Sequence, residues 1–515
     1  MRRQQRMVIP TRRIKEYLVR PRSDFRRYKK GNPGNPGIRE RDWERLHRDQ
    51  KICVAIGLRH PRFAFFNDPG TGKTLISLTL ADHFKRIGRS RQVLVLVPNR
   101  ANKAEWQREV RKHFPNRRCL ILEGSSTGKW RQLEEDQDAL VVVETYAGLT
   151  RMVCDGDGDK LRPNKAKVLA LAAQFGGVVF DESTEVKGYN TLIFRICKKI
   201  SESMHMVLAL SGTPFGRDPT DLWSQMFLVD RGQTLGETLT LFRAGFFTVK
   251  DRYWGGFEYT FQRRKRKQLH DFLANRSLRF RLREADMPKI SYINRTITLS
   301  EEAADWYRRA TETLHSAEGD ALKIKNTFLR MRQLSSGFVG FKNDEDGRTA
   351  RIEFADNPKL ELLGSIVSSI PPDYKVICFH EFIYSGDRIC AELERRQISH
   401  VSLRGGTKDP TSVLKQFADP SGPQALVLNH RAGGFGLNLQ NAGYAIFYES
   451  PVSPILRRQT EARIHRSHSD YERIVVYDLL ALDTVDETIR EWHAQGRDLF
   501  QAILEGNINP LDLAA

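Results

Sequence analysis

The sequence predicts an α/β protein built from two tandem parallel sheets, and two observations carry this prediction. Short apolar runs such as Val93–Val97 alternate with longer segments of helical periodicity. A continuous apolar run is typical of a strand that is buried on both faces of a parallel sheet. The alternation also occurs twice, once before about residue 215 and again from Lys359 onward. We therefore expect two lobes of the same class.

The domain prediction has five parts. We expect a basic N-terminal arm and linker over 1–42, a first lobe over 43–245, a helical insertion over 246–355, a second lobe over 356–505 and a tail over 506–515. Residues 1–30 hold twelve Lys and Arg against two acidic residues, and a Gly- and Pro-rich stretch follows at 31–37. Such an arm either lies on phosphates or is a solubilising tail, and the sequence leaves both interpretations open.

The chain is strongly basic. It has a net charge of +20 and a pI near 9.7, which favours a polyphosphate partner such as nucleic acid; a basic but indifferent solvated surface is the alternative. No apolar run approaches the ~20 residues that a membrane span needs, and no secretory signal follows Met1. The six cysteines form no CxxC pair, so we expect reduced thiols rather than disulfides or a zinc site. The cytoplasm is the expected location.

The first lobe opens with a strand at 63–66, a Gly-containing loop, and a helix over 75–87 that ends before Gly88. Backbone N–H groups of such a loop and of the helix N-terminus can surround a phosphate. The residues expected to bind the nucleotide here are Asp68, Pro69, Gly70, Thr71, Gly72, Lys73 and Thr74. Asn67 stands where this phosphate-loop pattern starts with Gly, and we interpret Asn67 and Pro69 as family drift.

Further strands are predicted at 139–143, 175–180 and 207–210. Polar residues follow two of them, namely Asp181 and Glu182 after one and Ser211 to Thr213 after the other. Ligands of open parallel sheets sit at the carboxyl ends of the strands, so these residues can converge on the loop.

A strand-terminal Asp-Glu pair is more often a helix cap than a catalyst when it stands alone. Following a phosphate loop, it suits metal-assisted phosphoryl transfer. Lys73 would then reach the outer phosphates, Thr74 and Asp181 would hold magnesium, and Glu182 would deprotonate the attacking water.

The second lobe has predicted strands at 375–379, 400–403, 425–428, 445–448 and 474–478. Arg463 and Arg466 are predicted three apart on one helical face, where they can stabilise charge on a phosphoryl group. A surface basic helix is the alternative. Between the lobes, residues 215–300 are predicted to be mostly helical, with a basic run at 263–267 that either touches nucleic acid or is a solvated face.

A set of segments, taken in order along the chain, resembles the motifs of helicase superfamily two, specifically its SWI/SNF-type DNA translocase branch. The segments are Leu46–Gln50, 67–74, Val97–Asn99, Thr145-Tyr146, Asp181–Thr184, Ser211–Pro214, Arg431–Leu439 and Gln459–Arg466. The resemblance covers residues 43–490 and implies two RecA-like lobes with an ATP site between them. It also implies ATP and magnesium as cofactors and double-stranded DNA as the partner.

Several residue roles follow from this resemblance alone. Gln50 would recognise adenine, Gly436 would contact the nucleotide, and Arg463 and Arg466 would serve as arginine fingers. Coupling of hydrolysis to motion would involve Ser211, Thr213 and Gln459. Nucleic-acid contacts would come from Pro98, Asn99, Thr145, Arg404, Gly405, Arg431 and Asn438.

The expected activity is that of a compact bacterial or phage-type motor that hydrolyses ATP and moves along duplex DNA. A strand-separating DNA or RNA helicase is one alternative, and the motor subunit of a restriction or defence system with a nuclease partner is another. A non-enzymatic alternative is an ATP-gated nucleic-acid clamp. A panel of polynucleotide-stimulated ATPase measurements separates these alternatives.

Overall fold

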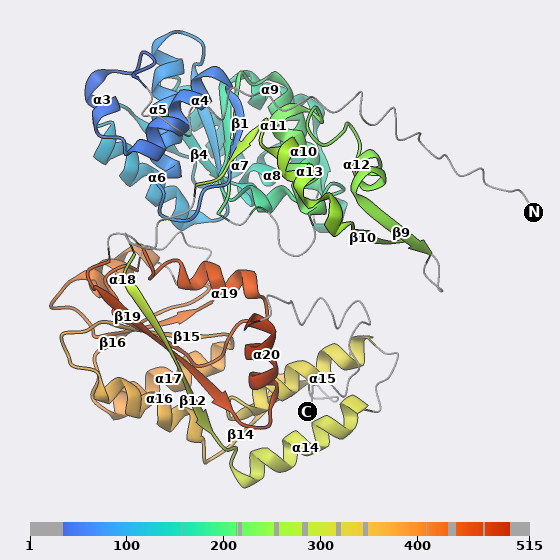
Figure 1. Ribbon diagram of the computed structural model, residues 1–515. Helices are drawn as coiled ribbons and strands as arrows, with labels where there is room; N and C mark the ends of the chain where they lie inside the picture. The colour runs from blue at the N-terminus through green and yellow to red at the C-terminus, as the bar shows by residue number, and fades with distance from the viewer. Residues whose placement is uncertain are drawn as a thin grey trace, which may run out of the picture. The chain divides into compact units, whose positions relative to one another are not determined.

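The computed structural model describes residues 34–494 except for a set of internal positions: 157, 213, 215–218, 252–256, 281–286, 316–320, 343–348, 408, 431–438 and 467–468. The chain divides into two compact units, Met1–Leu282 and Arg283–Ala515. Each unit contains one large parallel sheet covered by helices, which confirms the predicted fold class (Figure 1). The bounds of the five predicted parts remain predictions.

The first unit is organised on a seven-stranded sheet with the order β11-β1-β8-β7-β2-β4-β3, parallel throughout. Its strands are β1 Arg62–Phe65, β2 Gln92–Val97, β3 Cys119–Ile121, β4 Val141–Thr145, β7 Phe175–Phe180, β8 Met206–Leu210 and β11 Ser277–Leu278. Two hairpins add β5 Cys154–Asp155 with β6 Arg162–Pro163, and β9 Phe247–Asp251 with β10 Phe257–Phe261.

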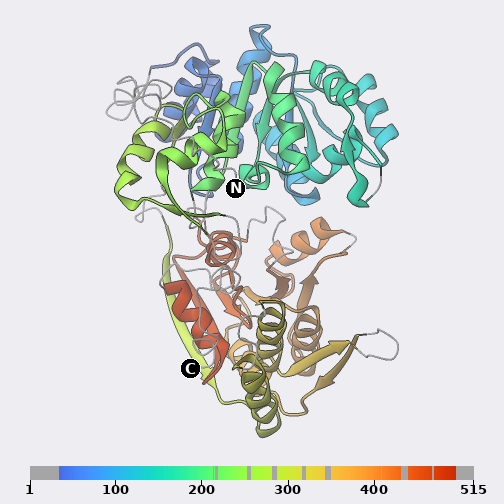
Figure 2. The same ribbon diagram turned by 90° about the vertical axis from the view of Figure 1, so that its right-hand side faces the viewer.

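Helices cover this sheet on both faces (Figure 2). They are α3 Glu40–Glu44, α4 Arg48–Arg59, α5 Lys73–Arg86, α6 Arg100–His113, α7 Ser126–Glu135, α8 Tyr146–Val153, α9 Lys165–Ala173, α10 Leu192–Ser203, α11 Thr220–Asp230, α12 Leu239–Phe246 and α13 Arg266–Leu273. Single 3₁₀ turns occur at η1 Gly158–Lys160, η2 Ser183–Val186 and η3 Arg263–Lys265.

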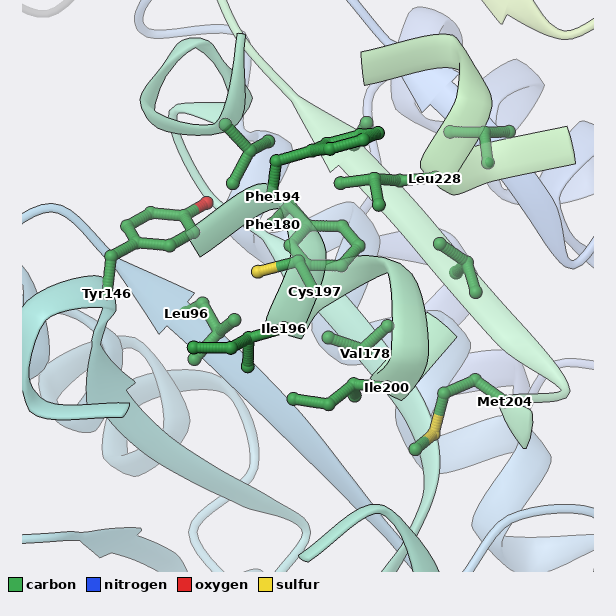
Figure 3. Close-up of a cluster of buried hydrophobic side chains, with 14 of the residues drawn as sticks. Leu96, Tyr146, Val178, Phe180, Phe194, Ile196, Cys197, Ile200, Met204 and Leu228 are labelled. Carbon is green, nitrogen blue, oxygen red and sulfur yellow. The ribbon is translucent and has the colours of Figure 1, made fainter. Parts of the chain in front are cut away.

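Strand β2 shows why its sequence is an unbroken apolar run. Side chains of a strand alternate between the two faces of its sheet. Leu94 and Leu96 pack into one buried cluster, whereas Val93, Val95 and Val97 pack into the other. The first of these clusters contains Phe180, Phe194 and Cys197, beside the Tyr146 ring (Figure 3). Both faces of the strand therefore exclude water.

The second unit has a six-stranded parallel sheet with the order β12-β19-β18-β15-β17-β16. Its strands are β12 Lys289–Ile297, β15 Val376–His380, β16 His400–Leu403, β17 Ala425–Asn429, β18 Tyr444–Phe447 and β19 Arg473–Ala481. A separate antiparallel pair joins β13 Phe338–Lys342 to β14 Thr349–Glu353. The helices are α14 Glu301–His315, α15 Ala321–Leu334, α16 Pro358–Ser369, α17 Ile383–Arg395, α18 Pro410–Ala418, α19 Pro454–Glu461 and α20 Val485–Ala494.

The region predicted as mostly helical, 215–300, also contains four strands, β9 to β12. Strand β12 lies at the edge of its sheet, and all of its side chains are exposed or partly exposed. Such a strand needs no apolar run, so periodicity alone gave no signal for it. Among the described residues, no helix combines the length and the apolar character needed to cross a membrane.

Candidate functional site

The carboxyl edge of the first sheet gathers the predicted catalytic segments. Strand β8 pairs with β1 on one side and with β7 on the other, so the phosphate-type loop, Ser211 and Asp181-Glu182 follow three adjacent parallel strands. Neighbouring strands lie about 4.8 Å apart, which places β1 and β7 about 10 Å from each other. The backbone N–H of Ser211 donates to the carbonyl of Phe65 at 3.3 Å and closes this edge. The predicted convergence within this unit is therefore observed.

The loop between β1 and α5 has the backbone shape that a phosphate cradle needs. Gly70 and Gly72 have φ of 83° and 77°, in the left-handed region that favours glycine. Gly72 is also the N-cap of α5, so it is followed by the N–H groups of the first helical turn, which have no acceptor within the helix itself. The Lys73 ammonium donates to the backbone carbonyls of Asn67 at 2.8 Å and Asp68 at 3.1 Å. Lys73 thus folds back across the loop, where an anion would meet it.

Gln50 is the polar residue that joins helix α4 to this loop. Its Nε2 donates to the Thr71 carbonyl at 3.2 Å, and its Oε1 accepts from the backbone N–H of His47 at 3.0 Å. A Cβ on Gly72 would lie 2.2 Å from Gln50 Nε2, so the amide and the loop are in direct contact. This contact explains why glycine is required at 72 for space as well as for conformation.

Asp181 is held from several sides at the end of β7. Its Oδ2 accepts from the indole N–H of Trp106 at 2.9 Å, and its Oδ1 accepts from the backbone N–H of Glu182 at 3.2 Å. The Tyr146 hydroxyl donates to its backbone carbonyl at 2.9 Å. Burial raises the pKa of Asp181, while the Trp106 N–H and the Lys73 charge oppose that rise. The carboxylate is thereby oriented and lies within electrostatic reach of Lys73.

Trp106 is a positioning residue that the sequence analysis missed. Its spacing with Val110 and Phe114 fits a core face, and all three side chains are buried. The one signal that separates Trp106 from its apolar neighbours is the indole N–H, since a buried indole usually finds an acceptor. Here that acceptor is the candidate metal-binding carboxylate.

Glu182 adopts φ 48° and ψ 62°, a left-handed conformation that is unusual for a residue with a side chain. The Ser211 hydroxyl donates to its Oε2 at 3.4 Å. Strained backbone at a strand end directs a side chain in a way that a relaxed strand would not. Ser211 therefore connects the segment after β8 to the carboxylate that was predicted to activate water.

The structure also corrects the interpretation of Asn67 and Pro69 as family drift. The buried Asn67 accepts from the backbone N–H of Phe280 at 2.9 Å, and its Nδ2 contacts Cys53 Sγ at 3.4 Å. The carbonyl of Phe280 in turn accepts from Asp68 N–H at 3.0 Å. Asn67 therefore fixes the start of the loop to the chain after β11.

Pro69 packs closely against the backbone after β8. A Cβ on Gly212 would lie 2.8 Å from Pro69 Cδ, which no real side chain tolerates without movement. The proline thus brings the phosphate-type loop into contact with the segment that begins at Ser211. Both departures from the expected loop sequence have structural roles.

In the second unit, the prediction that Arg463 and Arg466 share a helical face is wrong. Helix α19 ends at Glu461, and both arginines lie in the turns that follow. The helix stops because the carbonyl of Arg463 accepts from the Leu439 N–H at 3.0 Å, and the His465 ring pairs with the Pro288 carbonyl at 2.8 Å. These contacts bend the chain away from the helical path.

The predicted nucleic-acid contacts lie at strand ends where they are described. Asn99 and Thr145 cap helices α6 and α8, the latter accepting from the Gly148 N–H at 2.9 Å. Arg404 and Gly405 are exposed after β16, and Arg404 pairs with Asp387. Pro98 is partly buried after β2. Gln459, which was predicted to couple hydrolysis to motion, lies in α19. Their assigned roles stay predictions. Thr213, Gly436, Arg431 and Asn438 lie outside the described residues.

The fold and the first-unit site define a protein with a helicase-type ATPase core, and the comparison with family models gives its family. The SNF2-related domain matches residues 60–341, and the Helicase conserved C-terminal domain matches 358–468. The chain belongs to the SNF2-related family. This confirms the resemblance to the SWI/SNF-type branch and, as a family property, the use of ATP.

Several relatives align with most of the length of this chain. An ATP-dependent helicase of Mycoplasma genitalium is 23% identical over 86% of the chain, and the Bacillus subtilis ATP-dependent helicase/translocase YwqA is 24% identical over 82%. The chain spans only 40% and 44% of these two proteins. Protein p41 of Acyrthosiphon pisum secondary endosymbiont phage 1 is 23% identical, with 93% of its length covered.

Among solved structures, the Pyrococcus furiosus Hef helicase domain shares the fold. The match has a TM-score of 0.51 at 15% identity and covers 89% of this chain and all of that domain.

Proposed function

We propose that this chain is an ATP-driven motor that moves along double-stranded DNA. The observation that carries the proposal is the set of polar groups at one sheet edge: Lys73 folded across its loop, Asp181 held by Trp106, and Glu182 bonded by Ser211. Membership of the SNF2-related family and relatives named as ATP-dependent helicases support the same function.

In this proposal, the residues of the first unit bind and orient the nucleotide. Backbone N–H groups at the start of α5 and the Lys73 ammonium would contact the β- and γ-phosphates, which carry the charge they complement. Gln50 would present its amide at the edge of the loop, because its side chain is already fixed against Thr71 and Gly72.

Thr74, in the first turn of α5, and the oriented carboxylate of Asp181 would hold magnesium. Oxygen donors of this kind match the preference of the ion. The bound ion would supply charge neutralisation at the phosphates. Glu182 would accept the proton of the attacking water at its carboxylate. The Ser211 hydroxyl, which donates a hydrogen bond to that carboxylate, would respond to its change of charge.

Arginines from the second unit would supply further positive charge to the proposed chemistry. Arg463 and Arg466 lie directly after α19, where short turns rather than a helix present them. Their charge would act on the transferring phosphoryl group, and nucleotide-dependent changes at this point would drive stepping. The basic composition supports a polyphosphate track, and bacterial and phage relatives support action in the cytoplasm.

The test is an ATPase panel with duplex DNA, single-stranded DNA and RNA, together with displacement of a third strand from a DNA triplex. Duplex-stimulated turnover with triplex displacement, and without separation of the two duplex strands, supports the proposal. Stronger stimulation by single strands together with unwinding would identify a helicase instead. Tight ATP-dependent DNA binding without turnover would identify a clamp.

Lys73→Ala is the matched variant for this panel. Loss of the ammonium removes the charge that meets the phosphates, so turnover should fall by at least ~10²-fold. Circular dichroism and thermal unfolding should stay close to wild type, because the substitution removes only the two bonds that Lys73 donates to carbonyls of its own loop. Turnover near the wild-type value would refute the assigned role.

A further inference from the structure

Buried ionic groups surround Arg457 in the second unit, directly before the turn that carries Arg463 and Arg466. The Arg457 side chain is only 6% exposed and the Asp478 side chain is fully buried. Taking a guanidinium out of water is costly unless its donors find partners. This arginine finds them on strand β19, in the segment after β18 and on its own helix.

The hydrogen bonds of Arg457 are distributed over three directions. Its Nε donates to Glu461 Oε1 at 2.6 Å, and one terminal nitrogen donates to Ser450 Oγ at 2.6 Å and to Asp478 Oδ1. The other terminal nitrogen donates to Asp478 Oδ2 at 3.0 Å. The guanidinium carbon also lies 3.4 Å from the ring centroid of Phe447, the last residue of β18. Arg457 is thereby fixed to β18 and β19 at once.

Glu461 carries this constraint to the arginine-bearing turn. It is the last residue of α19, and its backbone carbonyl accepts from the N–H groups of Ile464 at 3.0 Å and His465 at 2.9 Å. Its carboxylate is held by Arg457 and also accepts from the Tyr292 hydroxyl of β12 at 3.3 Å. Glu461, whose carbonyl begins the turn, is thus held by Arg457 of its own helix and by Tyr292 of β12.

We infer that Arg457 is a positioning residue: with Asp478 and Glu461 it sets the end of α19 and so the placement of Arg463 and Arg466. This inference rests on the proposed function for its catalytic consequence, because Arg463 and Arg466 matter for turnover only if they act on the nucleotide. The placement itself is independent of that function.

A purely stabilising role is the competing explanation. Replacing a buried ion pair by apolar groups often leaves stability unchanged, so buried pairs are weak evidence for stability and fit a role in fixing geometry. The pair formed by Lys359 and Asp486 offers a matched control. It is equally buried in the same unit, with Nζ and Oδ2 2.5 Å apart, but its residues belong to α16 and α20 rather than α19.

The experiment compares Arg457→Met, Arg457→Lys, Glu461→Ala and Lys359→Met in the full chain, with Arg466→Ala as the reference for loss of the arginine itself. Glu461→Ala leaves the buried pair of Arg457 and Asp478 in place, so it remains informative if Arg457→Met fails to fold. Readouts are kcat and KM for ATP, and amide hydrogen exchange of peptides covering 458–466.

For Arg457→Met and Glu461→Ala we expect kcat to fall about tenfold with KM within about twofold, because geometry in the transition state is lost rather than ground-state binding. Arg457→Lys should recover part of the rate. Exchange over 458–466 should accelerate, while β15 exchanges as in wild type. Lys359→Met should lower stability but leave kcat and this exchange unchanged.

Loss of stability without faster exchange over 458–466, or kcat equal to that of Lys359→Met, would overturn the inference. Should wild type show no ATPase activity, the proposed function fails and hydrogen exchange still decides the positioning role. Should Arg466→Ala abolish turnover while the Arg457 and Glu461 variants keep it, the motor assignment stands and the inference falls.

Discussion

Single hydrogen bonds set the orientation of the groups at the first sheet edge. Asp181 receives an indole N–H, Glu182 receives a serine hydroxyl, and Lys73 is bonded to two loop carbonyls. The bonds to Asp181 and Glu182 come from other segments of the chain, whereas those of Lys73 stay within its own loop. The chemistry of the site therefore depends on residues that bear no charge as much as on those that do.

Trp106→Phe tests the bond to Asp181. Phenylalanine keeps an aromatic ring in the core but has no donor, so the Asp181 carboxylate loses its orientation. We expect kcat for ATP hydrolysis to fall about tenfold with little change in KM, and stability to fall by about 1–3 kcal/mol from the smaller ring. Steady-state kinetics and urea unfolding measure the two effects.

Val110→Ala is the control, since Val110 is fully buried one turn along the same helix face and its apolar side chain has no hydrogen-bond donor. It should lose stability while keeping kcat. A Trp106→Phe enzyme with wild-type kcat would show that the indole serves packing alone.

Loops and helix ends carry the parts of the site that local sequence patterns describe least well. The phosphate-type loop was predicted from its glycines and its strand–loop–helix order, and the structure has the same order. The contacts of Asn67 with Phe280 and of Pro69 with Gly212 join positions far apart in the chain, so no local pattern could reveal them. The roles of Asn67 and Pro69 are determined by contacts with distant parts of the chain.

The end of α19 is a second place where the local sequence pattern does not predict the structure. Residues up to Arg466 keep the composition of a helix, and nothing at 462–466 is a strong helix breaker. The chain leaves the helix because Leu439 and Pro288 compete for its backbone and side chains. Strands β9, β10 and β12 escaped prediction for a related reason, since exposed strands at edges and hairpins lack continuous apolar runs.

Asn67→Ala tests the connection between the loop and the chain after β11. The substitution removes the acceptor of the Phe280 N–H in a buried setting, which costs about 1–3 kcal/mol of the free energy of unfolding. The Lys73 bonds to the loop use backbone carbonyls and should persist. Chemical unfolding and hydrogen exchange of peptides covering 276–280 give the measurement.

Asn164→Ala provides a comparison, because Asn164 caps the exposed start of α9 through the Lys167 N–H. It should accelerate exchange in α9 and leave 276–280 as in wild type. Equal protection of 276–280 in the Asn67 variant and the wild-type protein would contradict the structural role given to Asn67.

At the scale of the whole molecule, the two units share a class of sheet but bury different polar groups. The second unit encloses two histidines, His380 and His430, at the carboxyl ends of β15 and β17. The His430 ring packs against both Phe379 and Phe447, with centroid distances of 5.6 Å to each, and these two rings lie 4.8 Å from one another; one ring nitrogen of His430 pairs with the Glu449 carbonyl. A buried imidazole in such a stack is stable only when neutral.

We expect this burial to make the second unit sensitive to acid. Burial lowers the pKa of His380, and it lowers that of His430 well below the usual value. The carbonyl of Glu449 opposes the shift of His430, whereas the charges of His380, Arg457 and Arg332 add to it. In the unfolded chain each histidine titrates near pH 6.5. Below that pH the unfolded state binds more protons than the folded state, so stability is retained above about pH 7 and is lost as the pH falls.

We therefore expect the free energy of unfolding of the second unit to fall between pH 7.5 and 5.5, by about 1–1.5 kcal/mol for His430 and by less for His380, where nearby acidic groups and the Phe382 carbonyl oppose the effect of burial. Urea unfolding followed by pulse proteolysis, with fragments of the unit identified by mass spectrometry, measures this at each pH. In His430→Phe the aromatic stack remains but the titrating group is gone, so the pH dependence should shrink by the share of one histidine. An identical pH profile in that variant would show that His430 is not neutral in the folded protein or that other groups govern the acid sensitivity.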